Sequence, residues 1–257
     1  MKLNMSAPPR HRAILELLEA HGAVRVADLC ERFGVSEMTI RRDLTELERE
    51  GLLRRTHGGA ISARGRGYEP PFLTRTTRNQ EQKARIGRLA ASLIEEGDSI
   101  ALDVGTTTLE IARALHEKHN LTVLTNSLHI ANILASHPTI RLIIIGGILR
   151  PGELSMVGGL AEQGYREFFV DKLFVGVGGL SVEAGLTEYS LEDALVKRAM
   201  IKNAKERFVV ADASKLNRVA FAHVAALSDV HALITDIGAD TAIIHRIQES
   251  GIRVWRA

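Results

Sequence analysis

The stretch VSEMTIRRDLTELEREGLLRRTHGGA, residues 35–60, decides how this chain is organised. Ser36 suits the N-cap of a helix and Gly51 suits its end, so the residues between them predict a helix. The residues that follow, LLRRTHGGA, predict a short extended hairpin with a Gly-Gly turn. A helix followed at once by a hairpin is therefore expected here.

The predicted helix has one apolar line and one strongly basic side. At 100° per residue, Ile40, Leu44 and Leu47 fall close together and form the expected buried stripe. Arg42 lies on the opposite, outermost line, and Arg41 flanks it. The paired arginines therefore face away from the core.

The residues upstream complete a small helical domain. RHRAILELLEAHG (10–22) and AVRVADLCERFG (23–34) each predict a helix that ends at a glycine. The turn FGVS between the second and third helices is short and contains glycine, as a helix-turn-helix requires. Three helices and a hairpin predict a winged helix-turn-helix domain over residues 1–61.

The third helix is the candidate DNA-reading element, because the N-terminal half of this helix enters the major groove. Arg42 is expected to read base edges, and Arg41 to hold the backbone or a neighbouring base. The alternative is a solvated face on which Arg42 pairs with Glu46. Basic residues on the presumed wing weaken that alternative. The candidate DNA-binding residues are Ser36, Met38, Thr39, Arg41, Arg42, Thr45, Arg54, Arg55 and His57.

Composition indicates an ordinary globular chain with a modest charge asymmetry. Hydrophobic residues make up 45% and charged residues 25% of the 257 residues. Residues 1–66 carry 12 basic and 9 acidic residues, and eleven of the basic ones are arginine, which suits bidentate contacts with phosphate or guanine. No apolar run is long enough for a membrane span, and the first residues lack a secretory signal. With the single Cys30, these features favour a cytoplasmic protein.

The second part of the chain has a different pattern of apolar and polar residues. Residues 62–82 are rich in Gly, Pro, Arg and Thr and are predicted to be a linker. Helical segments then alternate with short apolar strands, which predicts an α/β domain with a buried, mostly parallel sheet over residues 83–257. The expected strands are 99–105, 121–125, 140–147, 172–178, 207–212, 231–236 and 252–255, and the expected helices are 83–97, 108–120, 127–138, 191–204 and 241–250.

Several of these strands end in glycine or polar residues. Asp103, Gly105, Thr106, Thr107 and Thr108 fall at a strand-to-helix turn, where backbone amides and hydroxyl groups can hold an anion. A simple helix cap is the alternative at any one of these turns. Because the carboxyl ends of parallel strands line one crevice, the repeated pattern favours a pocket. The other strand ends that contribute are Asn126, Gly146, Gly147, Arg150, Gly176 and Lys215.

Both halves resemble the DeoR family of bacterial transcriptional repressors. The first is similar through VSxxTIRRDL and GLLxRxHGGA, and the second through DVGTTT, TN, GG and DASK. The resemblance implies an effector domain similar in fold to ribose-phosphate isomerases and CoA transferases. It implies that Gly105 to Thr108 hold the phosphate of a sugar phosphate, that Lys215 adds positive charge, and that Asp103 and Asn126 bind hydroxyl groups.

Two further basic residues are less certain members of the expected phosphate site. Arg150 and Lys197 are further candidate anion partners. Lys197 lies one turn after Asp193, however, so an ion pair on the helix surface is the favoured expectation for it.

Three functions remain open at this level. The leading one is a DNA-binding repressor of a carbohydrate catabolic operon, active as a dimer or tetramer and controlled by a phosphorylated sugar. The second is a sugar-phosphate isomerase with an added DNA-binding segment, with acid and base groups at Asp103, Glu153, Glu188, Glu192 and Lys215. The third is a DNA-binding protein that responds to a partner protein. No cofactor is expected, and the histidines, including His116 and His119, lack the partners and spacing of a metal site.

Overall fold

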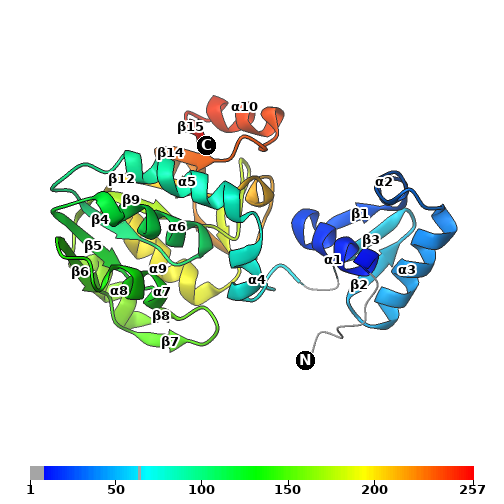
Figure 1. Ribbon diagram of the computed structural model, residues 1–257, viewed down its shortest axis with the longest axis horizontal. Helices are drawn as coiled ribbons and strands as arrows, with labels where there is room; N and C mark the ends of the chain where they lie inside the picture. Colours follow the sequence, from blue (N-terminus) through cyan, green and yellow to red (C-terminus); the bar gives the residue numbers. More distant parts are fainter. Residues whose placement is uncertain (1–8, 63–64) are drawn as a thin grey trace. The chain divides into compact units, whose positions relative to one another are not determined.

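The computed structural model describes residues 9–62 and 65–257, and the chain divides into two compact units after Tyr68 (Figure 1). Residues 1–8 of the predicted first domain and residues 63–64 of the predicted linker lie outside the described residues. Residues 69–82, also expected in the linker, belong to the second unit and contain a helix and the start of another.

The first unit is a winged helix-turn-helix, as predicted. Three helices accompany a three-stranded antiparallel sheet of order β1-β3-β2. The elements are α1 (Pro9–His21), β1 (Ala23–Arg25), α2 (Val26–Phe33), α3 (Glu37–Arg49), β2 (Leu53–Thr56) and β3 (Gly59–Ser62). Gly22, Gly34 and Gly51 follow the helices with positive φ angles, so the expected helix ends are confirmed.

The buried stripe on α3 is also confirmed, since Ile40, Leu44 and Leu47 are each at most 1% exposed. The same side of α3 buries Asp43, which was not expected. Its carboxylate accepts hydrogen bonds from Arg10 and pairs with the His11 ring 3.2 Å away, so it ties α3 to α1.

Two local predictions in this unit were wrong. The segment 23–34 begins with strand β1 rather than with the helix, because Val24 pairs with Ala60 in β3. The turn of the hairpin lies at His57 and Gly58, since Gly59 is already in β3. A Cβ at Gly59 would lie 1.9 Å from the Val24 carbonyl oxygen, so glycine is required at this position, where β3 pairs with β1.

The second unit is built on a seven-stranded parallel sheet of order β15-β14-β12-β9-β4-β5-β6. Its strands are β4 (Ser99–Leu102), β5 (Leu121–Thr125), β6 (Ile140–Ile144), β9 (Val170–Val175), β12 (Ala204–Val210), β14 (Ala232–Thr235) and β15 (Arg253–Arg256). All seven expected strands are therefore present and share one sheet.

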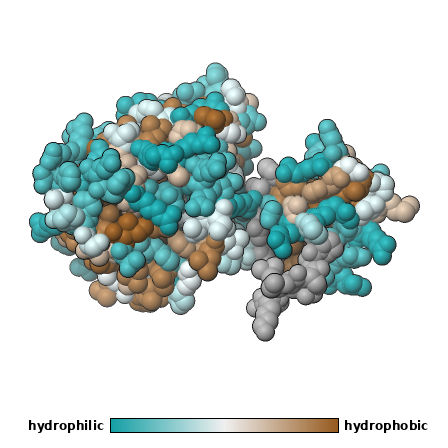
Figure 2. Space-filling model, in the orientation of Figure 1, coloured by the Kyte–Doolittle hydropathy of each residue, from teal (hydrophilic) through white to brown (hydrophobic). Residues whose placement is uncertain are grey.

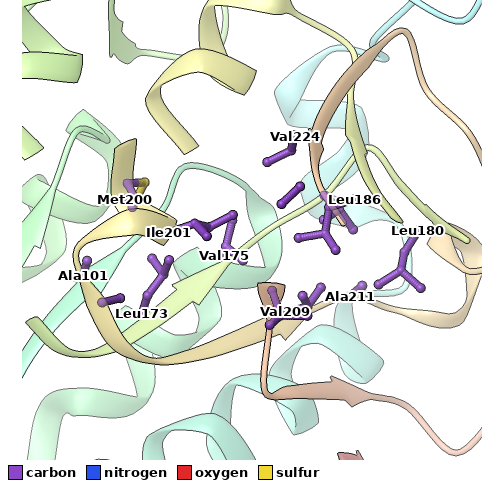
Figure 3. Packing of buried hydrophobic residues seen from close by; sticks show 14 of the residues in the cluster. Ala101, Leu173, Val175, Leu180, Leu186, Met200, Ile201, Val209, Ala211 and Val224 are labelled. Carbon is purple, nitrogen blue, oxygen red and sulfur yellow. The ribbon is translucent and has the colours of Figure 1, made fainter. Parts of the chain in front are cut away.

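Helices cover both faces of this sheet (Figure 1). On one face lie α5 (Gln80–Ser92), α6 (Thr106–Ala114) and α7 (Leu128–Leu134), and on the other α8 (Gly159–Arg166), α9 (Leu191–Lys202) and α10 (Thr241–Glu249). Side chains alternate along each strand. In β9, for example, Phe174 faces α5 and α6, whereas Leu173 and Val175 pack in the cluster beneath α9 (Figure 3).

Smaller elements, which the sequence pattern did not predict, extend the α9 side of the unit. They are the hairpin β7 (Ile148–Arg150) and β8 (Ser155–Val157), and a sheet of β10 (Gly179–Ser181), β11 (Gly185–Glu188) and β13 (Ala222–Ala225). A short helix, α4 (Phe72–Thr77), precedes α5, and three 3-10 turns complete the unit: η1 (Leu115–Glu117), η2 (Ala213–Lys215) and η3 (Leu227–Asp229). The visible face of the unit is largely hydrophilic with small apolar patches (Figure 2). None of the described helices is long and apolar enough to cross a membrane.

The order of the strands reverses between β4 and β9. From β4 the chain adds β5 and β6 on one side, and from β9 it adds β12, β14 and β15 on the other. In open α/β sheets this reversal opens a crevice at the carboxyl ends of the two central strands. A ligand is therefore expected just after Leu102 and Val175.

Candidate functional site

The outer side of α3 presents the predicted DNA-reading residues to solvent. Met38 is 81% exposed and the Arg42 side chain 80% exposed. Ser36 caps the helix by accepting a hydrogen bond from the Thr39 amide at 3.3 Å. The N-terminal half of α3 is thus ordered and accessible.

The two arginines do pair with acidic residues on the same helix. Arg41 contacts Glu37, and Arg42 lies 3.4 Å from Glu46. Exposed pairs of this kind are worth about 0.3–0.5 kcal/mol, so they do not prevent the guanidinium groups from engaging an anion. Both the ion pair and a role in DNA binding are therefore compatible with this geometry.

The wing is connected to α3 by polar contacts. The Arg55 amide donates to Glu48 at 2.7 Å, and the Arg55 guanidinium donates to the Thr45 hydroxyl at 2.8 Å. Arg54 and His57, the other predicted wing residues, are exposed. The structure thus places the nine candidates on two connected elements, and their contacts with DNA remain a prediction.

The second unit contains a pocket at the reversal of strand order. It lies where β4 and β9 end, and its volume of about 500 Å³ includes space that is open to solvent. Its lining comes from the first turn of α6, the ends of β9, β11 and β12 with the residues after them, the β7–β8 hairpin, α9 and η2, together with Glu69 and Arg75. Of the predicted effector residues, those that line it are Gly105, Thr106, Thr107, Thr108, Arg150, Gly176 and Lys215.

The start of α6 is suited to hold an anion. Gly105 has φ +133° and ψ 167°, a conformation available in practice only to glycine, and no side chain caps the helix. By contrast, Ser127, Ser190 and Asp240 cap α7, α9 and α10 with their side chains. The amides of the first turn of α6 are therefore available for an anionic ligand.

Lys215 supplies a positive charge to this pocket. Its amine donates to the Tyr189 hydroxyl at 3.1 Å and lies 5.1 Å from the centre of that ring. The other cations that line the pocket, Arg75, Arg150 and Lys197, all pair with carboxylates, whereas Lys215 forms no ion pair with a described residue. Its charge is thus the one available to a ligand within the described part of the chain.

Lys197 is not on the helix surface, so the expectation of a surface ion pair was wrong. It is 1% exposed, and its ammonium group contacts Asp103, the Glu188 carboxylate at 3.2 Å and the Gly176 carbonyl at 3.0 Å. These three acceptors use the three N–H groups of the ammonium ion. The side chain points inward because α9 packs directly over the ends of β4 and β9.

Asp103 is the buried partner of this lysine. It also accepts a hydrogen bond from the Gly176 amide at 2.9 Å, so it joins the ends of β4 and β9. Burial raises the pKa of Asp103 to about 6, although Lys197 acts against this rise. Burial lowers the pKa of Lys197, but Asp103 and Glu188 outweigh it and raise that pKa above its usual value. This group holds the pocket floor together; Lys197 and Glu188 also line the pocket, whereas Asp103 does not.

The remaining predicted effector residues lie elsewhere. Asn126 donates to the Met156 carbonyl at 2.8 Å and accepts from the Tyr165 hydroxyl at 3.0 Å. Gly146 and Gly147 follow β6, at the edge of the sheet. Because β5 and β6 are removed from the reversal, their carboxyl ends do not line the pocket.

Four polar residues of the pocket were given no functional role by the sequence reasoning. Glu69 and Arg75 lie in the segment predicted to be a linker, and Pro70 and Pro71 there suggested only a break in structure. Tyr189 and Asp193 complete the set. The capping pattern before α9 was the signal available for Asp193, whereas the sequence offers no comparable signal for Glu69.

Comparison with known proteins agrees with both halves of this description. Residues 10–65 match the DeoR-like helix-turn-helix domain, and residues 78–237 match the DeoR C terminal sensor domain. The glycerol-3-phosphate regulon repressor of Escherichia coli (strain K12) is 33% identical over 97% of this chain and 99% of its own length. The transcriptional repressor AccR of Agrobacterium fabrum is 39% identical over 93% of each chain.

A more distant likeness exists among solved structures. Ribose 5-phosphate isomerase A from Methanocaldococcus jannaschii has a TM-score of 0.41 and 20% identity, over 54% of this chain and 55% of that one. This distant likeness does not indicate a function. The relatives that span the whole chain are transcriptional regulators, so the isomerase alternative is excluded and the protein is not an enzyme. With a helix-turn-helix unit followed by a sensor unit, the chain belongs to the DeoR family of transcriptional repressors.

Proposed function

We propose that this repressor acts in the cytoplasm on a carbohydrate catabolic operon and that a phosphorylated sugar in the pocket controls its affinity for operator DNA. The observation that carries the proposal is the uncapped first turn of α6, which lines the same pocket as Lys215. Backbone amides at a helix N-terminus and an ammonium group that forms no ion pair with a described residue together favour a phosphate group.

The rest of the pocket suits a polyhydroxylated ligand. The carboxylates of Glu153, Glu188 and Asp193 line it and offer hydrogen-bond acceptors to hydroxyl groups. A sugar phosphate presents both chemistries, with a phosphate at one end and hydroxyl groups along its chain. The relative from Escherichia coli is named for the regulon of glycerol 3-phosphate, a phosphorylated polyol, which fits this chemistry.

Two copies of the chain are needed for the proposed DNA recognition. A helix-turn-helix protein reads half-sites related by two-fold symmetry, one with each copy of α3. Within each half-site Arg42 contacts base edges, and Arg54, Arg55 and His57 contact phosphates. The sugar phosphate acts by binding one arrangement of the oligomer more tightly than the other.

Fluorescence anisotropy on duplex DNA from upstream of the protein's own gene, at fixed salt, tests the proposal. Ribose 5-phosphate, fructose 1-phosphate and glycerol 3-phosphate form the first panel. At least one sugar phosphate should change the affinity, and Lys215→Met should remove its effect while leaving DNA binding intact. Lys205→Met, at an exposed position of β12, is the matched control. Tight DNA binding that no sugar phosphate changes would favour control by a partner protein.

A further inference from the structure

The pocket is tied to the segment through which the chain enters the second unit. We call residues 69–79 the connecting arm, which comprises Glu69, two prolines, α4 and the two residues after it. Both Glu69 and Arg75 of the arm line the pocket. The arm begins directly after Tyr68, where the first unit ends.

The α4 part of the arm is firmly anchored. Phe72 is 6% exposed and stacks on the His129 ring with 4.0 Å between ring centres. The buried Lys83 ammonium donates to the carbonyl groups of Arg75 and Arg78 at the end of α4. Apolar packing and these hydrogen bonds keep α4 in place independently of any ligand charge.

The Glu69 carboxylate is held by charge instead, and the next residue, Pro70, is held by a hydrogen bond from the Arg75 guanidinium to its carbonyl at 3.0 Å. One Glu69 oxygen lies 2.7 Å from the Arg150 guanidinium, and the other lies 2.9 Å from that of Arg75. Arg150 also pairs with Asp193 at 2.6 Å, and Arg75 also pairs with Glu153. The two guanidinium groups therefore share three carboxylates, and Glu69 is the member that bridges them.

The charge balance of this cluster decides what can replace Glu69. An anionic group that takes the place of its carboxylate leaves the charge around the two arginines unchanged. Without Glu69 each arginine would keep one carboxylate, Asp193 for Arg150 and Glu153 for Arg75, but the bridge between them would be lost. An acidic group restores charge-assisted hydrogen bonds to both arginines, whereas a neutral hydroxyl group makes only weaker ones. An acidic replacement is therefore favoured.

We propose that Arg150 and Arg75 form a second anion subsite, which Glu69 fills in the free protein, and that an effector with a second acidic group displaces Glu69 and releases residues 65–69. This inference rests on the proposed function, because it assumes that a first phosphate binds at α6. It narrows the effector class to sugar bisphosphates and phosphorylated sugar acids. It also gives the pocket a direct connection to the chain that leads into the DNA-binding unit.

Calorimetric titration of the full chain with matched pairs of ligands tests the proposal. The pairs are glucose 6-phosphate with 6-phosphogluconate, and fructose 6-phosphate with fructose 1,6-bisphosphate. Glu69→Gln removes the internal competitor, so it should strengthen binding of a doubly acidic ligand by about threefold to tenfold. It should change binding of the monophosphate by less than about twofold. Glu81→Gln, an 87% exposed carboxylate on α5, is the control.

Hydrogen–deuterium exchange supplies a second readout. A doubly acidic ligand should speed exchange of the amides of residues 65–69, and Glu69→Gln should do so without ligand. Exchange within α4 and α5 should stay unchanged. Glu69→Asp keeps the charge and should behave like the native protein. It serves as the second variant if Glu69→Gln proves unstable.

The outcomes separate the two proposals. If the monophosphates bind and Glu69→Gln alters neither affinity nor exchange, the second subsite is refuted and the proposed function stands. Weaker binding of a doubly acidic ligand to Glu69→Gln would also refute it, because Glu69 would then position Arg150 instead of competing for it. If no sugar phosphate binds either protein, both proposals fail.

Discussion

Replacing Lys197 with methionine should be the most damaging single change in the floor of the pocket. The substitution keeps the volume and length of the side chain but removes the charge that pairs with Asp103 and Glu188. Both carboxylates are less than 10% exposed and would share a buried site without a counter-ion. Removing one partner of a buried pair costs about 3–5 kcal/mol, a large share of a typical domain's stability of about 5–15 kcal/mol.

Urea unfolding followed by tryptophan fluorescence measures this cost. Trp255 is the only tryptophan of the chain and lies in β15, so its emission reports the second unit. Lys202→Met, at the exposed end of the same helix, should cost less than about 1 kcal/mol. Equal losses for the two variants would refute the argument from burial.

The pH dependence of the same variant provides an independent check. The pKa of Asp103 is raised from 3.8 to about 6 by burial, so folding favours its protonated form. Its contribution to stability is present below pH 4 and is lost as the pH rises through 6. Without Lys197 the pKa should rise further. The variant should therefore recover stability between pH 7 and pH 5, relative to the native protein.

Three further substitutions test other parts of the description. Arg42→Ala should reduce discrimination at one base pair of the operator by about 1–3 kcal/mol, measured by anisotropy on singly substituted duplexes; an equal loss on all sequences would make Arg42 a phosphate contact. Asp43→Ala should destabilise the first unit by about 1–3 kcal/mol, seen as faster hydrogen exchange in α1. Burial raises the pKa of Asp43, but hydrogen bonds from Arg10 and His11 outweigh burial and lower the pKa below 3.8. The stabilisation that Asp43 gives the native unit should therefore be lost only as the pH falls below about 4. Gly105→Ala forces alanine into φ +133° and should lower the free energy of unfolding by about 1–3 kcal/mol, measured by thermal unfolding. It should also weaken sugar-phosphate binding by at least about tenfold, while operator binding persists. Unchanged ligand affinity would place the phosphate elsewhere.

The helices of the first unit and the seven strands of the large sheet were predictable because each is set by local pattern. The stripe of Ile40, Leu44 and Leu47 needs only helical periodicity, and the seven apolar strands need only their length and composition. The helix ends at Gly22 and Gly34 follow from the left-handed conformation that glycine permits. Strand β1 was missed because its three residues become a strand only through pairing with β3.

The pocket was predictable only in part, for a physical reason. Sequence places Gly105 and Asn126 at the ends of strands, but only the order of strands in the sheet decides which ends meet. Likewise, periodicity cannot show that Lys197 faces Asp103, 94 residues earlier in the chain. Glu69 joins the pocket through a long-range ion pair with Arg150, and no local pattern encodes that contact.

The position of Glu69 bears on how a signal can leave the pocket. The pocket and α3 belong to separate units of one chain, so the covalent path between them runs through the residues just before Glu69. Gly105→Ala should weaken ligand binding but leave the connecting arm tied, whereas Glu69→Gln should untie it without ligand. If the arm carries the signal, Glu69→Gln alone should shift operator affinity in the direction of the effector, and Gly105→Ala should not. If neither variant alone shifts affinity, the arm does not carry the signal.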